Sequence, residues 1–188
     1  MIQEGDRAPR FRLPIARGRA YNDVETFDLA EALGDGPVVL AFFPAAFTSG
    51  CTEELRAFTA DARAFEDLDA AVYGISVDLS FSHNEFIETE DLDVPLLSDH
   101  RREVTRAYGV VYEGMYDHFE VSQRSVFVLD ADGVVRHRWV REGDNPDFET
   151  FVDDLQDVVR EVRETDYLNQ GESPAVHGGR ESDNCADP

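Results

Sequence analysis

Residues 38–55 read VVLAFFPAAFTSGCTEEL. The apolar run at 38–43 contains no charged residue, which predicts a β-strand buried on both faces of a sheet. After a short loop, apolar positions recur every three or four residues from Cys51 to about Phe65, which is the spacing of an amphipathic helix. The segment is therefore predicted to be a central strand that passes through a loop into a helix, with Cys51 in the first helical turn.

Further strands are predicted after this segment. Residues 71–77 form a second apolar run, and residues 125–129 and 134–140 flank Asp130-Ala131-Asp132-Gly133. That tetrapeptide is a tight-turn signal, so the two flanking runs are expected to pair as an antiparallel hairpin. Strands that alternate with helices indicate an α/β fold with a central mixed β-sheet flanked by helices.

Two more helices are predicted. Ser82-x-x-Glu85 has the form of a capping box, which would begin one of them. Apolar residues over 148–162 follow helical spacing and mark a long amphipathic helix that should cover one face of the sheet.

The chain has the length of one domain. It contains 188 residues, of which 42% are hydrophobic, enough to build a substantial core. Residues 169–188 are polar and lack periodicity. We therefore expect a folded domain over 1–168 and a flexible acidic tail over 169–188 that carries Cys185.

The charge of the chain restricts its partners. The net charge is −23, and all 17 basic residues are arginine. Such a surface repels nucleic acids and anionic lipids, so we expect neither as a partner. The acidic residues are spread along the chain without any lysine, which we interpret as adaptation to high salt. No apolar stretch could span a bilayer and residues 1–6 do not resemble a signal peptide, so a cytoplasmic location is expected.

Cys51 and Cys185 are the two cysteines. A reducing compartment favours a reactive thiol over a structural disulfide. In the first turn of a helix, unpaired backbone N–H groups and the helix dipole stabilise an anion, so Cys51 is predicted to be held as a thiolate. In Pro44-x-x-x-Thr48-x-x-Cys51, the proline ring can shield the sulfur from water and the threonine hydroxyl can form hydrogen bonds beside it.

This segment resembles the peroxiredoxin active-site motif, Pro-x-x-x-Thr/Ser-x-x-Cys. The resemblance extends over roughly residues 4–165, through segments that follow in the family's order: 4–14, 74–78 with 81–83, 95–99 and 124–130. It implies a thioredoxin-like fold. It also implies that Arg124, which precedes a late strand, lies near Cys51 and stabilises both the thiolate and the reacting peroxide, and that Glu54 orients Arg124 by an ion pair.

The resemblance implies a thiol-dependent peroxidase. Cys51 would reduce hydrogen peroxide or organic hydroperoxides and become a sulfenic acid, with Thr48 bonding the peroxide oxygen and no metal or organic cofactor required. A thioredoxin-type or low-molecular-weight thiol would then reduce it. Cys185 could act as a resolving cysteine or be dispensable, and its surroundings depart from those of the family's C-terminal resolving cysteines. A homodimer or larger homo-oligomer is expected.

The same fold supports other functions. A thioredoxin-like disulfide reductase needs a Cys-x-x-Cys pair, but Thr48 occupies the partner position. A copper-delivery protein needs paired cysteines and a nearby histidine ligand, and the five histidines show no zinc-binding spacing. A non-enzymatic holdase or a redox-sensing or partner-binding module on the same fold stays open, because fold alone does not determine function.

Overall fold

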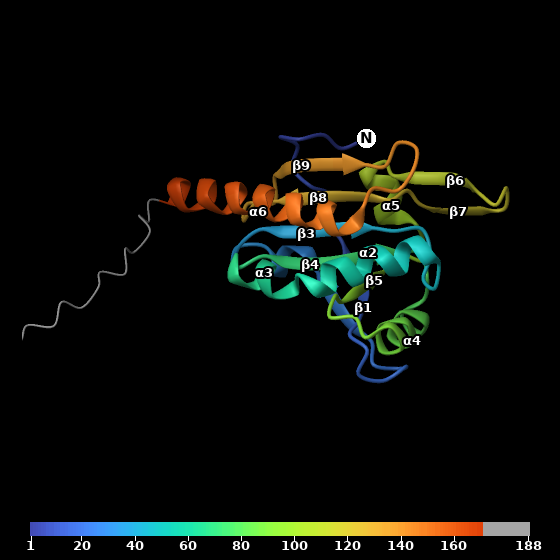
Figure 1. Ribbon diagram of the computed structural model, residues 1–188. Helices are drawn as coiled ribbons and strands as arrows, with labels where there is room; N and C mark the ends of the chain where they lie inside the picture. Colours follow the sequence, from blue (N-terminus) through green and yellow to red (C-terminus); the bar gives the residue numbers. More distant parts are fainter. Residues whose placement is uncertain (171–188) are drawn as a thin grey trace, which may run out of the picture.

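The computed structural model describes residues 1–170. Within this range seven strands form one mixed sheet, which crosses the molecule in Figure 1. Their order across the sheet is β2 (Glu25–Asp28), β1 (Arg12–Ala16), β5 (Leu96–Ser98), β4 (Ala71–Ser76), β3 (Val38–Phe42), β8 (Ser125–Leu129) and β9 (Val135–Val140). The central pairs β3–β4 and β4–β5 are parallel, and the flanking pairs are antiparallel. The predicted mixed sheet, its central strands and the β8–β9 hairpin are confirmed.

Helices cover both faces of the sheet. Those of the described part are α1 (Leu29–Ala32), α2 (Ser49–Ala60), α3 (Ala62–Asp67), α4 (Ser80–Glu90), α5 (Glu103–Tyr108) and α6 (Phe148–Gln170). Side chains of α2, α3, α4 and α6 contribute to one hydrophobic cluster, and those of α1 and α5 contribute to the other. Among residues 1–170, no helix is apolar enough over a sufficient length to cross a membrane.

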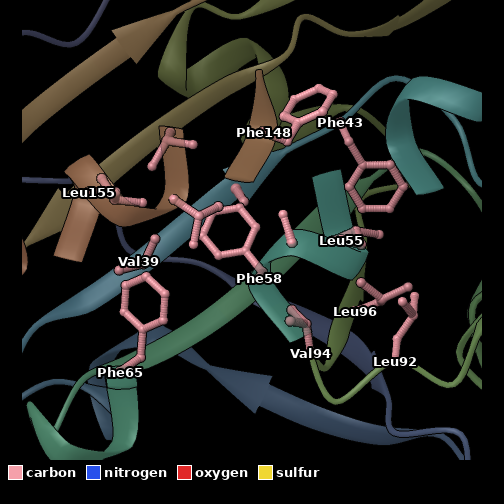
Figure 2. Packing of buried hydrophobic residues seen from close by; sticks show 14 of the residues in the cluster. Val39, Phe43, Leu55, Phe58, Phe65, Leu92, Val94, Leu96, Phe148 and Leu155 are labelled. Carbon is pink, nitrogen blue, oxygen red and sulfur yellow. The ribbon is translucent and has the colours of Figure 1, made fainter. Parts of the chain in front are cut away.

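Strand β3 separates the two hydrophobic clusters. Every residue of β3 is buried, as its uncharged sequence predicts. Because side chains alternate along a strand, Val39 and Ala41 face one cluster, whereas Val38, Leu40 and Phe42 face the other. Figure 2 shows the first cluster, in which the Phe58 ring lies among side chains from β3, α2 and α6. Two well-packed faces hold β3 firmly, and its C-terminal end therefore offers a rigid base for the following loop.

Three local predictions need correction. The helix predicted over 51–65 begins earlier, at Ser49, and is interrupted at Asp61, where the backbone leaves helical geometry (φ −104°, ψ 11°). Its apolar spacing continues because Phe65 still packs on Phe58, with ring centroids 5.9 Å apart. The prediction that the capping box at Ser82 begins a helix was wrong. Helix α4 begins at Ser80, with Leu79 in the capping position, so Ser82 is already helical.

The predicted end of the domain also differs slightly from the structure. Helix α6 continues through Gln170, so the boundary expected at residue 169 falls inside its last turn. Residues 171–188, including Cys185, lie outside the described residues, and the tail stays a prediction.

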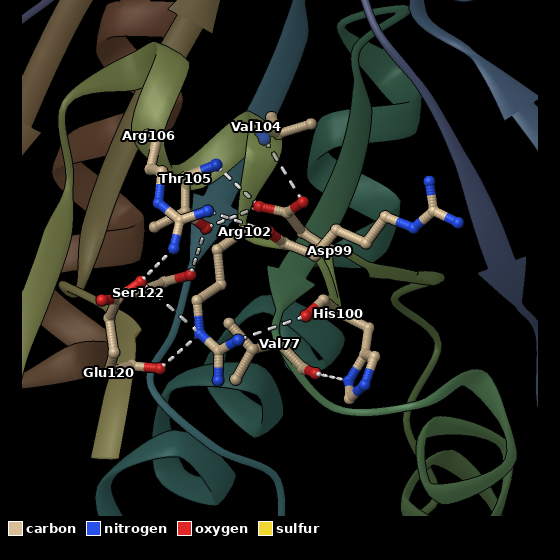
Figure 3. Close-up of polar contacts among 10 residues, drawn as sticks. Val77, Asp99, His100, Arg102, Val104, Thr105, Arg106, Glu120 and Ser122 are labelled. Atoms are coloured by element: carbon tan, nitrogen blue, oxygen red, sulfur yellow. Dashed lines mark hydrogen bonds and ion pairs between the residues drawn. The ribbon is translucent and has the colours of Figure 1, made fainter. Parts of the chain in front are cut away.

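A buried carboxylate joins β5 to α5 and, through Thr105, to Ser122 (Figure 3). Asp99 accepts hydrogen bonds from the backbone N–H groups of Val104 and Thr105, at 3.2 and 2.6 Å, near the start of α5. The Thr105 hydroxyl donates to the same carboxylate at 2.7 Å and also contacts the Ser122 hydroxyl at 2.8 Å. These bonds satisfy helix-terminal donors and fix the residues after β5 in place.

Aromatic residues near the β6–β7 hairpin divide into core and surface. The hairpin consists of β6 (Val111–Met115) and β7 (Phe119–Ser122). Tyr108 is fully buried, with its ring 5.2 Å from that of Phe42, so core packing accounts for it. Tyr116 and Phe119 are exposed on the hairpin itself.

Candidate active site

Cys51 lies in the first turn of α2, as predicted. The helix begins after Thr48, which caps it with an extended backbone but without a side-chain hydrogen bond to the helix. Backbone N–H groups of a first turn have no partner within the helix, so they and the helix dipole favour a negative charge at this end. Cys51 is only 1% exposed and belongs to the same hydrophobic cluster as Val39 and Phe58, which limits the access of water.

Strand pairing brings Arg124 to the sulfur. Arg124 immediately precedes β8, and the register pairs Ser125 of β8 with Phe42 at the end of β3. The arginine is thereby placed beside the start of the loop that leads to Cys51. Its Nη2 group donates a hydrogen bond to Cys51 Sγ at 3.4 Å, across 73 positions of sequence.

The guanidinium of Arg124 is charged and buried, since its side chain is 3% exposed. Burial alone would lower the pKa of Arg124, but the negative charge of Glu54 and the sulfur of Cys51 outweigh this effect and raise that pKa. A permanent positive charge in contact with the sulfur stabilises a thiolate, and more strongly here than it would in water.

Glu54 forms the ion pair that the resemblance implied. It lies one helical turn after Cys51 and is fully buried, and its Oε2 accepts a hydrogen bond from Arg124 Nη1. Burial raises the pKa of Glu54 to about 7, although Arg124 acts in the opposite direction. The carboxylate therefore holds one edge of the guanidinium while the other edge contacts the sulfur.

Two residues that the sequence analysis missed complete the surroundings of Arg124. Asn145 Oδ1 accepts hydrogen bonds from Arg124 Nε at 3.2 Å and from Arg141 Nη1 at 3.1 Å. The Phe148 ring, at the start of α6, lies 5.2 Å from the guanidinium carbon in a cation–π arrangement. Asparagine in a loop and phenylalanine on a helix have ordinary structural roles, so the sequence alone held no signal for either.

Gly50 permits this close packing. A Cβ atom at position 50 would lie 2.6 Å from Asn145 Nδ2 and 3.3 Å from Arg124 Nη2. The first distance is too short for atoms that are not bonded, so any larger residue would displace Asn145 from Arg124.

The structure places Pro44 and Thr48 in the loop between β3 and α2. Pro44 is buried at the end of β3. The Thr48 hydroxyl donates to the Ala45 carbonyl at 2.9 Å, and among the described contacts it makes no hydrogen bond to the sulfur, contrary to expectation. Its proton is engaged within the loop, so the oxygen is left as an acceptor for a donor that enters the site.

A buried histidine lies behind the loop. His83 of α4 is fully buried, and its Nε2 is 2.7 Å from the Ser76 hydroxyl at the end of β4. Its Nδ1 has no hydrogen-bond partner within residues 1–170. Protonation would bury an unpaired charge, and burial accordingly lowers the pKa of His83 to about 4, against a weaker opposing effect of Asp78.

The low pKa of His83 predicts a pH-dependent stability. A histidine that stays neutral when folded stabilises the protein fully above its unfolded pKa, near 6.5, and loses this contribution as pH falls toward 4. In His83→Gln the side-chain amide can still donate to Ser76 but does not titrate. As pH falls over that interval, we expect the free energy of unfolding of His83→Gln to decrease by about 3 kcal/mol less than that of wild type. Urea unfolding of both proteins at several pH values measures the difference, and parallel pH profiles would contradict it.

Within residues 1–170, no group of three His, Cys, Asp or Glu side chains is arranged to hold a metal ion. Cys185 cannot be placed relative to Cys51, because it lies outside the described residues. Of the predicted site residues in the described part, Cys51, Arg124 and Glu54 are joined directly by hydrogen bonds. Pro44 and Thr48 belong to the adjoining loop.

The fold and the site define a thioredoxin-like α/β protein with a buried, arginine-paired cysteine at a helix start. The chain belongs to the AhpC/TSA family, which matches residues 4–138. It is 37% identical over 131 residues to a putative peroxiredoxin of Mycobacterium tuberculosis, an alignment that covers 70% of this chain and 80% of that protein. It is 31% identical over 140 residues to a chloroplastic 2-Cys peroxiredoxin of Spinacia oleracea, covering 71% of this chain and only 50% of the plant protein.

Solved structures agree with this membership. The crystal structure of peroxidoxin BcpB from Mycobacterium tuberculosis superposes with a TM-score of 0.74 at 31% identity, covering 86% of this chain and 99% of that one. A reduced 2-Cys peroxiredoxin of Plasmodium vivax has the same TM-score of 0.74 at 24% identity, covering 86% and 97% of the two chains, and supports the fold alone. The chain spans half of the length of the spinach relative, whereas it spans almost all of the BcpB structure.

Proposed function

We propose that this chain is a thiol-dependent peroxidase that reduces hydrogen peroxide or organic hydroperoxides through Cys51. The observation that carries the proposal is the hydrogen bond of 3.4 Å from Arg124 Nη2 to Cys51 Sγ at the start of α2. It places a positively charged donor against the sulfur, and the same donor can also reach an oxygen atom beside the sulfur. Family membership supports the same chemistry.

The first step is a displacement at oxygen. The thiolate of Cys51 attacks the terminal oxygen of the hydroperoxide, a sulfur–oxygen bond forms, and the oxygen–oxygen bond breaks. The electron pair of the broken bond leaves on the second oxygen, which takes a proton and departs as water or an alcohol. We propose that Arg124 stabilises the charge that develops and that the Thr48 oxygen accepts a hydrogen bond from the incoming hydroperoxide. Cys51 is left as a sulfenic acid.

A thiol completes the cycle. It attacks the sulfur of the sulfenic acid, releases water and forms a disulfide with Cys51, and a second thiol then reduces that disulfide. We propose a thioredoxin-type or low-molecular-weight thiol as the reductant, with Cys185 as a candidate for the first attacking thiol. A homodimer or larger assembly, a cytoplasmic location and adaptation to high salt stay predictions from the sequence.

Intact mass after addition of one equivalent of hydrogen peroxide tests the proposal. Wild-type protein should consume the peroxide and gain the mass of one oxygen atom, or lose two hydrogen atoms if Cys185 forms a bridge with Cys51. Cys51→Ser should leave the peroxide unconsumed, and Cys185→Ser should retain the first turnover. Equal consumption by wild type and Cys51→Ser would refute the proposal, and a holdase or partner-binding module would consume none in any variant.

A further inference from the structure

The loop that joins β3 to α2 holds an unfavourable backbone conformation. Phe47 has φ of 62°, in the left-handed region that residues with a side chain rarely adopt. The same loop carries Pro44, which is buried, and Thr48, whose oxygen accepts a hydrogen bond from the hydroperoxide in the proposed reaction. A strained segment keeps one conformation only where its surroundings hold it. The contacts of the residues next to Phe47 should therefore hold the loop in this conformation.

Residue 46 is held from outside the loop. The backbone N–H of Ala46 donates to Asp78 Oδ2 at 2.9 Å, across 32 positions of sequence. By contrast, the hydrogen bond from the Thr48 hydroxyl to the Ala45 carbonyl lies inside the loop. We propose that Asp78 is a positioning residue that holds this loop so that Thr48 and Pro44 keep their places beside Cys51. The proposal rests on the peroxidase function proposed above.

The oxygen that accepts from Ala46 is itself fixed by a buried hydroxyl. Ser76 is fully buried and its hydroxyl donates to the same Asp78 Oδ2 at 2.7 Å. A hydroxyl has one proton, so Ser76 Oγ must act as an acceptor in its other two contacts, from Asp78 N at 3.2 Å and from His83 Nε2 at 2.7 Å. His83 therefore carries its proton on Nε2. The chain of bonds runs from α4 through the end of β4 to the loop.

The backbone carbonyls of Val77 and Asp78 are held by β5 and by the residues that follow it. The Ser98 hydroxyl donates to the Asp78 carbonyl at 2.6 Å, and His100 Nδ1 lies 3.1 Å from the carbonyl of Val77, a contact visible in Figure 3. Hydrogen bonds to its backbone and to its side chain thus hold Asp78 in place, and its side chain in turn holds Ala46 in a fixed position relative to the sheet. A loop held in this way is preorganised for reaction, which spares the cost of ordering it in the transition state.

The two carboxylate oxygens of Asp78 have different surroundings, so two variants can separate the hydrogen bonds of this side chain from its charge. Ala46 and Ser76 both donate to Oδ2, and no hydrogen bond within residues 1–170 involves Oδ1. Asp78→Asn can therefore present its amide oxygen to both donors with its NH₂ group at the other position. Asp78→Ala loses both bonds. The matched control is Glu85→Ala, which removes an exposed carboxylate from α4, the helix of His83.

Two reactions of Cys51 should be followed in each variant: oxidation by hydrogen peroxide and alkylation by iodoacetamide. Alkylation needs the thiolate but no aligned oxygen–oxygen bond. Asp78→Ala should slow peroxide oxidation about 10- to 100-fold, because a misplaced group costs this much, while alkylation stays equal or becomes faster. Asp78→Asn and Glu85→Ala should match wild type in both reactions. If Asp78→Ala does not fold, Ser76→Ala replaces it, with a smaller loss in the same direction.

The outcomes separate this proposal from the peroxidase function on which it rests. Wild-type peroxide oxidation by Asp78→Ala would overturn the role of Asp78 and leave the function standing. Equal slowing of both reactions would also overturn it, because the effect would then lie in the thiolate or the fold. If Asp78→Asn were as slow as Asp78→Ala, the proposal would also be overturned, because the charge of Asp78 rather than its hydrogen bonds would be responsible. Failure of wild type itself to consume peroxide would refute the proposed function instead.

Discussion

Arg124→Gln is expected to slow the oxidation of Cys51 by hydrogen peroxide about 10²–10³-fold, the usual cost of removing one preorganised donor from a transition state. The guanidinium is the only charged donor in hydrogen-bond contact with the sulfur among the described residues, at 3.4 Å. Glutamine keeps hydrogen-bonding capacity but supplies no positive charge. The thiolate would lose its counterion, and the charge that develops on the leaving oxygen would lose its stabilising group.

Arg124→Lys separates the effect of the positive charge of Arg124 from that of its planar guanidinium group. Lysine keeps the positive charge but lacks the planar fork that contacts Glu54, Asn145 and the sulfur together, so an intermediate rate is expected. Stopped-flow peroxide consumption measures all variants, with Arg63→Gln as the control because Arg63 is exposed on α3. An Arg124→Gln protein that is folded and reacts at the wild-type rate would exclude Arg124 from the reaction.

Glu54→Ala is expected to lower the free energy of unfolding by about 3–5 kcal/mol, the range found when one partner of a buried ion pair is removed. Arg124 would then be a buried charge with its carboxylate partner gone, and a cavity would form beside α2. The peroxide reaction should slow as well, because the guanidinium would lose the bond that orients it toward Cys51. Urea unfolding and peroxide kinetics of the same preparation measure both effects.

Glu54→Gln distinguishes the charge of Glu54 from its hydrogen bond. Because burial raises the pKa of Glu54 to about 7, its favourable contribution is complete below the ordinary value of 4.5 and declines as pH rises through 7. Glutamine does not ionise, so the stability advantage of wild type over Glu54→Gln should shrink over that interval. Glu53→Ala, which removes the exposed neighbouring carboxylate, should remain near wild type in stability and rate. A Glu54→Ala protein as stable as Glu53→Ala would contradict the ion pair.

Local patterns in the sequence were sufficient for the main elements and for the nucleophile. An uncharged apolar run predicts a strand buried on both faces, and the end of that run places Cys51 in a first helical turn, because both properties depend on neighbouring residues. Local patterns predicted the wrong structure where packing in the core decides the conformation. The apolar spacing to Phe65 hides the break at Asp61, since both helices pack on the same cluster.

The partners of Cys51 depend on contacts between distant parts of the chain. Resemblance to a family implied Arg124 and Glu54, but their meeting is produced by the register of β3 with β8, which no local pattern encodes. The same holds for Asn145 and for Asp78, whose residue types have common roles in loops and turns. The sequence thus specified the strand, the helix start and the thiol, whereas strand pairing and packing alone decided which charges and hydrogen bonds surround the sulfur. Periodicity is a property of adjacent residues, but a buried polar group finds its partner only when the sheet has formed.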